Sequence, residues 1–274
     1  KIPHILSMTA TPIPRSLALT VYGELEISVI SQKPKNRLPI ETVIWSPNSR
    51  PQLYQIIDDE IKDGRQVFVV CPLIDDSENS EAKSVSEEVK RLKQGPFKHR
   101  RIGVLHGKMK DEEKADVMQQ FANQQLDILV STTVIEVGID IPNASVMLVE
   151  GADQFGLAQL HQLRGRVGRS ADQGYCYLIP STSQKPSKRL RAMESTTDGF
   201  KLAEMDLELR GPGAIYGSKQ HGALDLKIAN ITDATLIKRA KDSAVAFMQS
   251  NENLTAYPEL ERRVQKSLSL TYLN

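Results

Sequence analysis

The 274-residue sequence lacks long apolar stretches and lacks an excess of charge of either sign. No apolar run reaches the roughly 18 to 20 residues that a membrane-spanning helix needs, so we expect no membrane association. The 35 basic and 34 acidic residues leave a formal net charge of +1. A surface that coats nucleic acid as a whole would need a basic excess, so any contact with nucleic acid must come from a local patch.

Cysteine is scarce too. Cys71 and Cys176 are the only two, and each lies in an apolar, strand-like run. Two such residues exclude a disulfide framework and a cysteine-rich metal site, and they indicate reduced core residues of a cytoplasmic protein. We therefore predict no metal site. No internal repeat and no signal peptide are visible, although the sequence begins at Lys1 and not at a methionine.

Two motifs of nucleotide hydrolysis are also missing. The sequence contains no Gly-x-x-x-x-Gly-Lys-Ser/Thr loop, so nothing in it cradles a β-phosphate. No Asp-Glu-x-His follows a strand, so no carboxylate is placed to hold Mg²⁺. The content of 40% hydrophobic and 25% charged residues is nonetheless ordinary for a globular protein with a sizeable core.

Strand and helix patterns alternate through the middle of the chain. This alternation predicts an α/β fold, a mostly parallel sheet covered by helices on both faces. We expect three parts: an entry segment at 1–38, the α/β lobe at 39–182, and a helical hairpin with C-terminal helices at 183–274. The predicted strands are 41–45, 66–73, 101–106, 127–131, 145–150 and 175–179. The predicted helices are 51–62, 85–93, 111–123, 185–191, 198–210, 232–250 and 256–267.

Arginine and glycine gather at residues 159–169, Gln-Leu-His-Gln-Leu-Arg-Gly-Arg-Val-Gly-Arg. Arg164, Arg166 and Arg169 would repel one another unless an anion lies among them. Guanidinium groups grip phosphate oxygens in pairs, and glycines let the backbone approach a ligand. The pattern predicts a phosphate-binding segment, although a solvated basic turn is the simpler alternative and Arg164 alone could pair with a carboxylate.

A second pattern begins where the apolar run 127–131 ends. Thr132 and Thr133 follow it, and Gly138 and Asp140 come a few residues later. Polar residues at the carboxyl end of a parallel strand lie where open α/β sheets bind ligands. The threonines could instead cap a helix, and Asp140 could be an ordinary loop aspartate.

Together these two segments resemble motifs V and VI of superfamily-2 helicases. The resemblance covers nearly the whole chain, with 7–15 similar to motif III, 67–74 to motif IV, 104–109 to motif IVa, and 199–222 to the translocation motif shared by RecG and the transcription-repair coupling translocase. The sequences 15–25 and 226–231 favour the RecG family. The resemblance implies the second RecA-like motor lobe of an ATP-dependent DNA helicase.

The resemblance also implies roles for individual residues. Arg166 and Arg169 would reach the γ-phosphate as catalytic arginines, and Gly138, Asp140 and Gln162 would bind the nucleotide. DNA would be contacted by His106, Gly107, Thr132 and Thr133. Coupling of nucleotide state to movement would involve Thr9, Thr11, Arg210 and Gln220. A cation such as Arg210 at a helix end also has a purely local explanation, and the basic run 185–191 is either a solvated face or a further DNA contact.

The implied cofactors are ATP with Mg²⁺, and the implied partner is forked or branched double-stranded DNA. Because the phosphate loop and the Mg²⁺ carboxylates are missing, we expect the chain to be the trailing part of a larger protein and inactive alone. Its complement would be an N-terminal motor lobe and a wedge domain. Two alternatives stay open: a lobe of the transcription-repair coupling translocase, and a non-catalytic DNA-binding helicase lobe.

Overall fold

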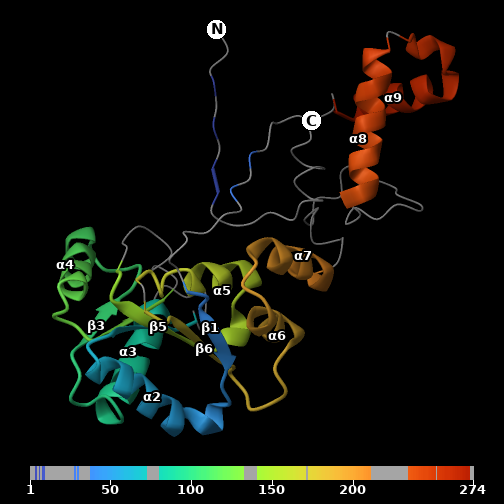
Figure 1. Cartoon of the computed structure of the whole chain (residues 1–274). Coiled ribbons are helices and arrows are strands. Elements are labelled where there is room, and N and C mark those ends of the chain that lie inside the picture. The colour runs from blue at the N-terminus through green and yellow to red at the C-terminus, as the bar shows by residue number, and fades with distance from the viewer. Residues whose placement is uncertain are drawn as a thin grey trace. The chain divides into compact units, whose positions relative to one another are not determined.

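The computed structural model describes residues 4, 6, 8, 9, 28, 30, 38–72, 80–132, 141–170, 172–210, 234–250 and 252–271 (Figure 1). Two compact units divide the chain, the first comprising 1–12 and 30–206, the second 13–29 and 207–274. The boundary between the two units, at residues 206 and 207, falls near the C-terminal end of the helix Gly199–Arg210. In the described residues no helix is both long and apolar enough to cross a bilayer.

The first unit is built on a six-stranded parallel sheet. Its strands are β1 (Glu41–Ile44), β2 (Gln66–Val70), β3 (Ile102–Leu105), β4 (Ile128–Ser131), β5 (Ala144–Glu150) and β6 (Tyr175–Ile179). They lie in the order β1-β6-β5-β2-β4-β3, and every neighbouring pair is parallel. The two central strands β2 and β5 are buried along their whole length, as expected of a parallel sheet with both faces covered. The predicted α/β fold is confirmed.

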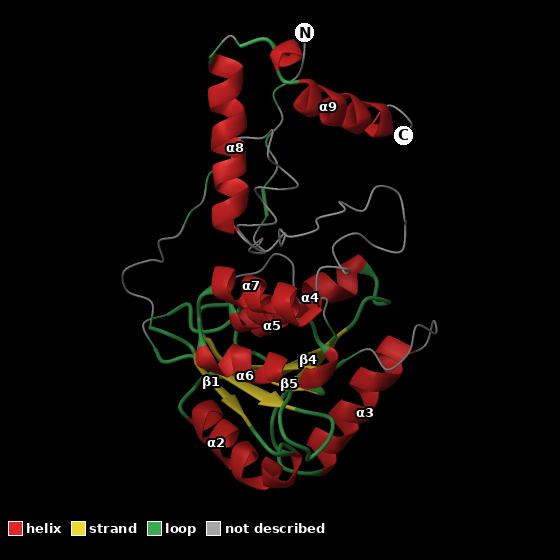
Figure 2. Cartoon of the chain, turned by 90° about the vertical axis from the view of Figure 1, so that its right-hand side faces the viewer, coloured by secondary structure: helices red, strands yellow, loops and turns green. Residues whose placement is uncertain are grey.

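Helices cover both faces of this sheet (Figure 2). The helices of the first unit are α2 (Arg50–Lys62), α3 (Ser80–Gln94), α4 (Asp111–Ala122), α5 (Leu157–Arg164) and α6 (Lys188–Ser195), and α7 (Gly199–Arg210) begins in this unit. Alternate residues of β2 belong to separate cores: Val67 and Val69 pack with α2 and α3, while Phe68 and Val70 pack with α4 and α5. The pleat of a strand sends successive side chains to opposite faces, which explains this division.

Three predicted helix starts need correction. α3 begins at Ser80, five residues before the predicted start. In α4, Asp111 is the first helical residue and not the cap, since the Glu113 side chain accepts from Lys110 N at 3.1 Å. α6 begins at Lys188, because Ser187 accepts from Leu190 N at 3.3 Å as its N-cap and the preceding proline disfavours helix in the residue before it.

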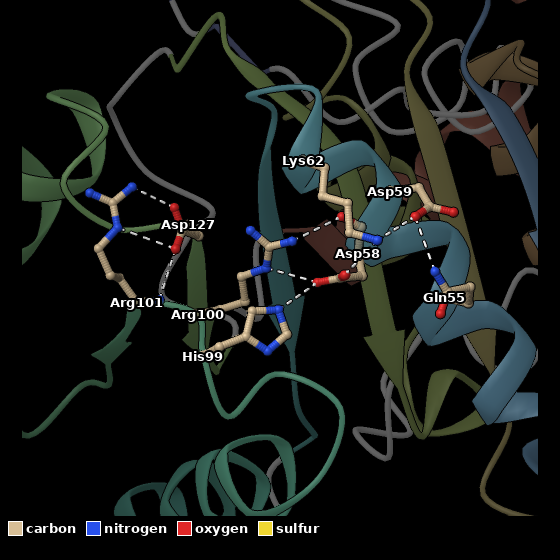
Figure 3. A network of polar contacts seen from close by, with 8 residues as sticks. All are labelled: Gln55, Asp58, Asp59, Lys62, His99, Arg100, Arg101 and Asp127. Atoms are coloured by element: carbon tan, nitrogen blue, oxygen red, sulfur yellow. Dashed lines mark hydrogen bonds and ion pairs between the residues drawn. The ribbon is translucent and has the colours of Figure 1, made fainter.

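A polar network joins the amino end of the sheet to the end of α2 (Figure 3). Arg101, just before β3, pairs with Asp127, just before β4, at 2.5 Å. Asp58 of α2 accepts from Arg100 Nε at 2.8 Å and lies 3.1 Å from Lys62 Nζ. The Arg100 contact holds the pKa of Asp58 below its ordinary value. These contacts tie β3 to α2 across the edge of the sheet.

α6 and α7 pack on the α5 side of the sheet, through Leu190, Met193 and Leu202. Asp198 caps α7 as predicted, accepting from Phe200 N at 2.9 Å. The second unit contains α8 (Ala234–Gln249), a short 3-10 turn at Leu254–Ala256 and α9 (Pro258–Thr271). There Phe247 meets Tyr257 edge to face with ring centroids 5.4 Å apart. Two closing helices were predicted close to these positions.

Candidate nucleotide and DNA interface

The arginine segment follows α5, a helix whose leucines fix it to the sheet. Leu157, Leu160 and Leu163 are fully buried, and their spacing places them on one helical face. At its start Gln159 Oε1 accepts from Gly156 N at 3.0 Å, closing the first turn. Because α5 runs antiparallel to β5, it delivers the arginines to the amino end of the sheet.

Two glycines hold the loop after α5 against the sheet. Gly168 has a φ of 62°, which favours glycine, and its N–H donates to Ala144 O at 3.2 Å. A Cβ on Gly174 would lie 2.7 Å from the Cα of Gly168. Gly174 in turn accepts from Glu41 N at 2.9 Å. The loop is therefore fixed to the first residues of β5 and β1, which leaves little freedom for the arginines beside it.

The two predicted catalytic arginines belong to this loop. Arg166 is half-buried and Arg169 is exposed, while Val167 between them is fully buried. Arg169 Nε donates to Gly165 O at 3.2 Å, so its side chain folds over its own loop. Two guanidinium groups held beside a fixed backbone can bind an anion such as a phosphate. Gln162 lies half-buried on the neighbouring turn of α5.

Arg164 differs from the other two arginines. It is buried, with 3% of its surface exposed, and among the described residues it pairs with no carboxylate, contrary to one alternative from the sequence. Its Nη1 donates to Met193 O at 2.8 Å and to Thr196 O at 2.9 Å, the carbonyls at the end of α6. A side chain with five donors and no acceptor suits such a task. Burial lowers the pKa of Arg164. This residue joins α5 to the turn between α6 and α7.

The predicted DNA-contacting residues lie at the opposite end of the sheet. His106 follows β3 and Thr132 follows β4, and the two strands pair Leu105 with Ser131. His106 Nδ1 and Thr132 Oγ1 are both buried, and neither has a hydrogen-bond partner in the described structure. Thr132 is fully buried, so its hydroxyl is not presented to a ligand as it lies here. Gly107 beside His106 is exposed.

The structure therefore separates the predicted site into two groups. The segment that begins at Thr132 was predicted at the carboxyl edge of the sheet, whereas the arginine segment lies at the amino ends of β1, β5 and β6. The reason is the length of α5, which returns the chain across the sheet before the arginines begin. Ile141 also lies at this end, with its carbonyl accepting from Ala144 N at 3.1 Å.

Several predicted residues have no described side chain. Thr11, Thr133, Gly138, Asp140 and Gln220 lie outside the described residues. Arg210 is the last residue of α7, and the structure describes its backbone alone. Thr9 is described and exposed. Within the described ranges no three His, Cys, Asp or Glu side chains gather as a metal site would require.

A buried charge cluster at the carboxyl end of β5 was not predicted. Glu150 is 6% exposed and receives Arg50 Nη2 at 2.6 Å and Arg91 Nη2 at 2.7 Å. Arg91 also binds Glu88 at 2.6 Å. The one feature of the sequence that could have indicated this cluster is Glu150, the single charged residue of the buried strand β5. The cluster fastens α2 and α3 to β5, because a buried carboxylate must keep its cationic partners.

Two family models match the chain. The helicase conserved C-terminal domain matches residues 49–171. The model described as "ATP-dependent DNA helicase RecG, domain 3, C-terminal" matches residues 196–271. The first match covers strands β2 to β5 and the whole arginine segment, and the second covers α7 to α9.

Curated relatives and a solved structure agree with these models. The ATP-dependent DNA helicase RecG of Synechocystis sp. is 48% identical over 94% of this chain and 31% of its own length. The protein of the same name from Aquifex aeolicus is 46% identical over 96% of this chain and 34% of its own length. The chain thus spans about a third of these relatives.

The solved structure is that of RecG bound to a three-way DNA junction. It superimposes with a TM-score of 0.66 and 42% identity, covering 85% of this chain and 30% of that one. These matches show that the chain belongs to the RecG family of DNA helicases and carries that family's helicase C-terminal lobe.

Proposed function

We propose that this chain is the second motor lobe of an ATP-driven translocase acting on forked or branched double-stranded DNA. The observation that carries the proposal is the arginine segment, held at the amino ends of β5 and β1 by Gly168 and Gly174. Two arginines on a fixed loop suit a charge that develops during phosphoryl transfer. The likeness to a RecG bound to a three-way junction supports branched DNA as the substrate.

In this proposal Arg166 and Arg169 stabilise the transferring γ-phosphoryl group, as arginine fingers do. ATP supplies that group, and Gln162, Gly138 and Asp140 contact the nucleotide. The chemistry of the arginines fits a triphosphate, because guanidinium groups bind phosphate oxygens in pairs. No described cluster of acidic residues is placed to hold Mg²⁺. The phosphate loop and the Mg²⁺ carboxylates would therefore come from the first motor lobe.

DNA would be held at the carboxyl ends of β3 and β4, through His106, Gly107 and Thr133, while the buried Thr132 would support the backbone of this turn. The unpartnered Nδ1 of His106 supports this, since buried polar atoms in native structures usually find a partner. A donor or acceptor at this edge can contact the phosphate backbone without reading bases. Such binding is independent of sequence and weakens as salt rises.

Through its contacts Arg164 could transmit a movement of α5, caused by nucleotide binding, to the helical hairpin. It lies between the arginine segment and the end of α6, and its two carbonyl partners precede α7. A shift of α5 on nucleotide binding would move this turn as well. Arg210 at the end of α7 and Gln220 beyond it would pass the movement to DNA, while Thr9 and Thr11 would relate the two motor lobes.

Two other functions fit fewer of the observations. A lobe of the transcription-repair coupling translocase would share the hairpin, but the matched model for residues 196–271 is the RecG one. A non-catalytic DNA-binding lobe would not need two arginines on a loop held by glycines. The RecG-like motor lobe accounts for both features.

The test is Arg169→Ala in the longer protein that also carries the phosphate loop. Hydrolysis of ATP in the presence of a DNA fork should fall by about 10³-fold, because an arginine finger acts on the transition state. Binding of a fluorescent ATP analogue should stay within a few-fold of the original. Arg263→Ala on α9 is the matched control and should hydrolyse normally. Near-normal turnover by Arg169→Ala would refute the catalytic assignment.

A further inference from the structure

The loop that carries Arg169 forms an ion pair with a residue from another part of the first unit. Asp172, near the end of this loop, pairs through Oδ2 with Arg65 Nη1. Arg65 lies between α2 and β2, 107 residues earlier in the chain. Both side chains are half-buried. The contact therefore joins the arginine segment to the amino end of β2, whereas the glycine contacts join it to β5 and β1.

The backbone at Arg65 is itself well fixed. The Arg65 N–H donates to Glu60 O at 3.0 Å, at the end of α2. The preceding Gly64 has a φ of 85°, and its carbonyl accepts from Asn143 Nδ2 at 2.9 Å. Asn143 directly precedes β5. Because helix α2 and the start of β5 both hold this turn, the guanidinium group of Arg65 gives the loop a defined attachment.

On the loop, the ion pair extends to the residue next to Arg169. Ser170 Oγ donates to Asp172 Oδ2 at 3.0 Å and accepts from Asp172 N at 3.3 Å. The Arg65 guanidinium, and after it the Ser170 hydroxyl, hold the pKa of Asp172 below its ordinary value, so the carboxylate is charged at neutral pH. Gly168, on the other side of Arg169, is bound to the first residue of β5. Arg169 therefore lies between two residues whose contacts lead to different strands.

A contribution to stability does not account for this ion pair. Ion pairs between partly exposed side chains contribute little to the stability of a fold. The loop is already fixed to β5 and β1 through Gly168 and Gly174. A third contact mainly restricts how far the residues between these glycines can move. Catalytic groups require such restriction, because a misplacement of about 1 Å can lower a rate by about 10²-fold.

We infer that Arg65 and Asp172 are positioning residues for Arg169, which they hold in place through Ser170. The inference rests on the proposed catalytic role of Arg169. Neither positioning residue needs to contact the nucleotide, since both act through the backbone of the loop. Breaking the ion pair should leave ATP binding nearly unchanged and slow hydrolysis, because a displaced arginine loses more in the transition state than in the ground state.

The first experiment tests the position of the loop without ATP. Hydrogen–deuterium exchange of residues 165–174 is measured by mass spectrometry in the 274-residue chain and in its Asp172→Ala variant. We expect exchange about 2- to 5-fold faster in the variant, because a loop that has lost one contact opens more often. Asp59→Ala is the matched control, since it removes an exposed ion pair on α2, with Lys62 at 2.8 Å (Figure 3). It should leave exchange in this segment unchanged.

The second experiment measures hydrolysis of ATP by the longer protein on a saturating DNA fork. Asp172→Ala should lower kcat about 10-fold, less than a displacement of 1 Å can cost, because the glycine contacts remain. KM for ATP should stay within a few-fold. Arg65→Gln should have the same effect, and the double variant should lose no more than either single variant. Arg65→Lys keeps the charge and should recover most of kcat. Thermal unfolding checks that each variant folds.

Several results would overturn the inference. Unchanged exchange in Asp172→Ala is one, and faster exchange with an unchanged kcat is another. A rise in KM at constant kcat would assign Asp172 to nucleotide binding instead. Arg169→Ala is measured in the same assay and separates the two ideas. If it is inactive while Asp172→Ala hydrolyses normally, the inference alone fails. If Arg169→Ala hydrolyses normally, the proposed function fails and the inference falls with it.

Discussion

Arg164 and Arg169 carry the same guanidinium group, five residues apart, in opposite surroundings. Arg164 is 3% exposed and ends on two backbone carbonyls, whereas Arg169 is exposed on the loop. Carbonyl groups at a helix end need donors, and here the buried Arg164 supplies them from a neighbouring helix. Packing therefore makes Arg164 a structural link, whereas Arg169 stays at the surface of the loop.

Arg164→Met should consequently destabilise the first unit by about 2–4 kcal/mol, since methionine fills the space but leaves both carbonyls of the α6 end without a donor. Urea unfolding followed by the fluorescence of Trp45 measures this change. Arg169→Met is the matched control and should lie within about 0.5 kcal/mol of the original chain. If both variants lost the same free energy of unfolding, the buried contacts of Arg164 would not contribute more to stability than the exposed side chain of Arg169.

Helices and strands could be predicted from the sequence where the local pattern of apolar residues determines them, whereas their first and last residues were harder to predict. Buried strands such as Gln66–Val70 are short apolar runs, and Gly64 ends the preceding helix with a φ of 85°, so the sequence alone placed them. The start of α3 was missed because acidic and polar residues hid its first turn. The end of α6 was not predictable, because Arg164, distant in sequence, supplies its donors.

The loop between α5 and β6 gives a prediction at this scale. Gly174→Ala would place a Cβ 2.7 Å from the Cα of Gly168, so the backbone of the arginine segment must shift. We expect a loss of about 1–3 kcal/mol of stability, and in the longer protein a clear fall in ATP hydrolysis as well.

Gly64→Ala is the control for that variant. Gly64 has a positive φ but open space around it, so alanine there should cost roughly 1–2 kcal/mol from backbone strain alone. Hydrolysis should be unchanged. If both variants lose stability while hydrolysis stays normal in both, the glycine contact does not position the arginines.

The arrangement of the whole lobe was the least predictable feature. Alternating patterns indicated a parallel sheet, but the order β1-β6-β5-β2-β4-β3 depends on contacts between segments distant in sequence. For the same reason the sequence predicted candidate functional residues but not their division between two edges of the sheet. On the proposed function, a motor lobe that meets nucleotide at one edge and DNA at the other would transmit movement through its rigid core.

A lobe of this kind should not hydrolyse ATP alone. The sequence has no phosphate loop, and the described residues hold no acidic cluster for Mg²⁺, so the arginines have no bound and activated phosphate to act on. We therefore expect the purified 274-residue chain to release no phosphate above background, with or without a DNA fork. The Arg169→Ala chain, measured alongside, identifies contamination, because turnover present equally in both comes from another enzyme. Turnover in the original chain that Arg169→Ala abolishes would show that this lobe is catalytically sufficient, and would overturn the two-lobe mechanism proposed for it.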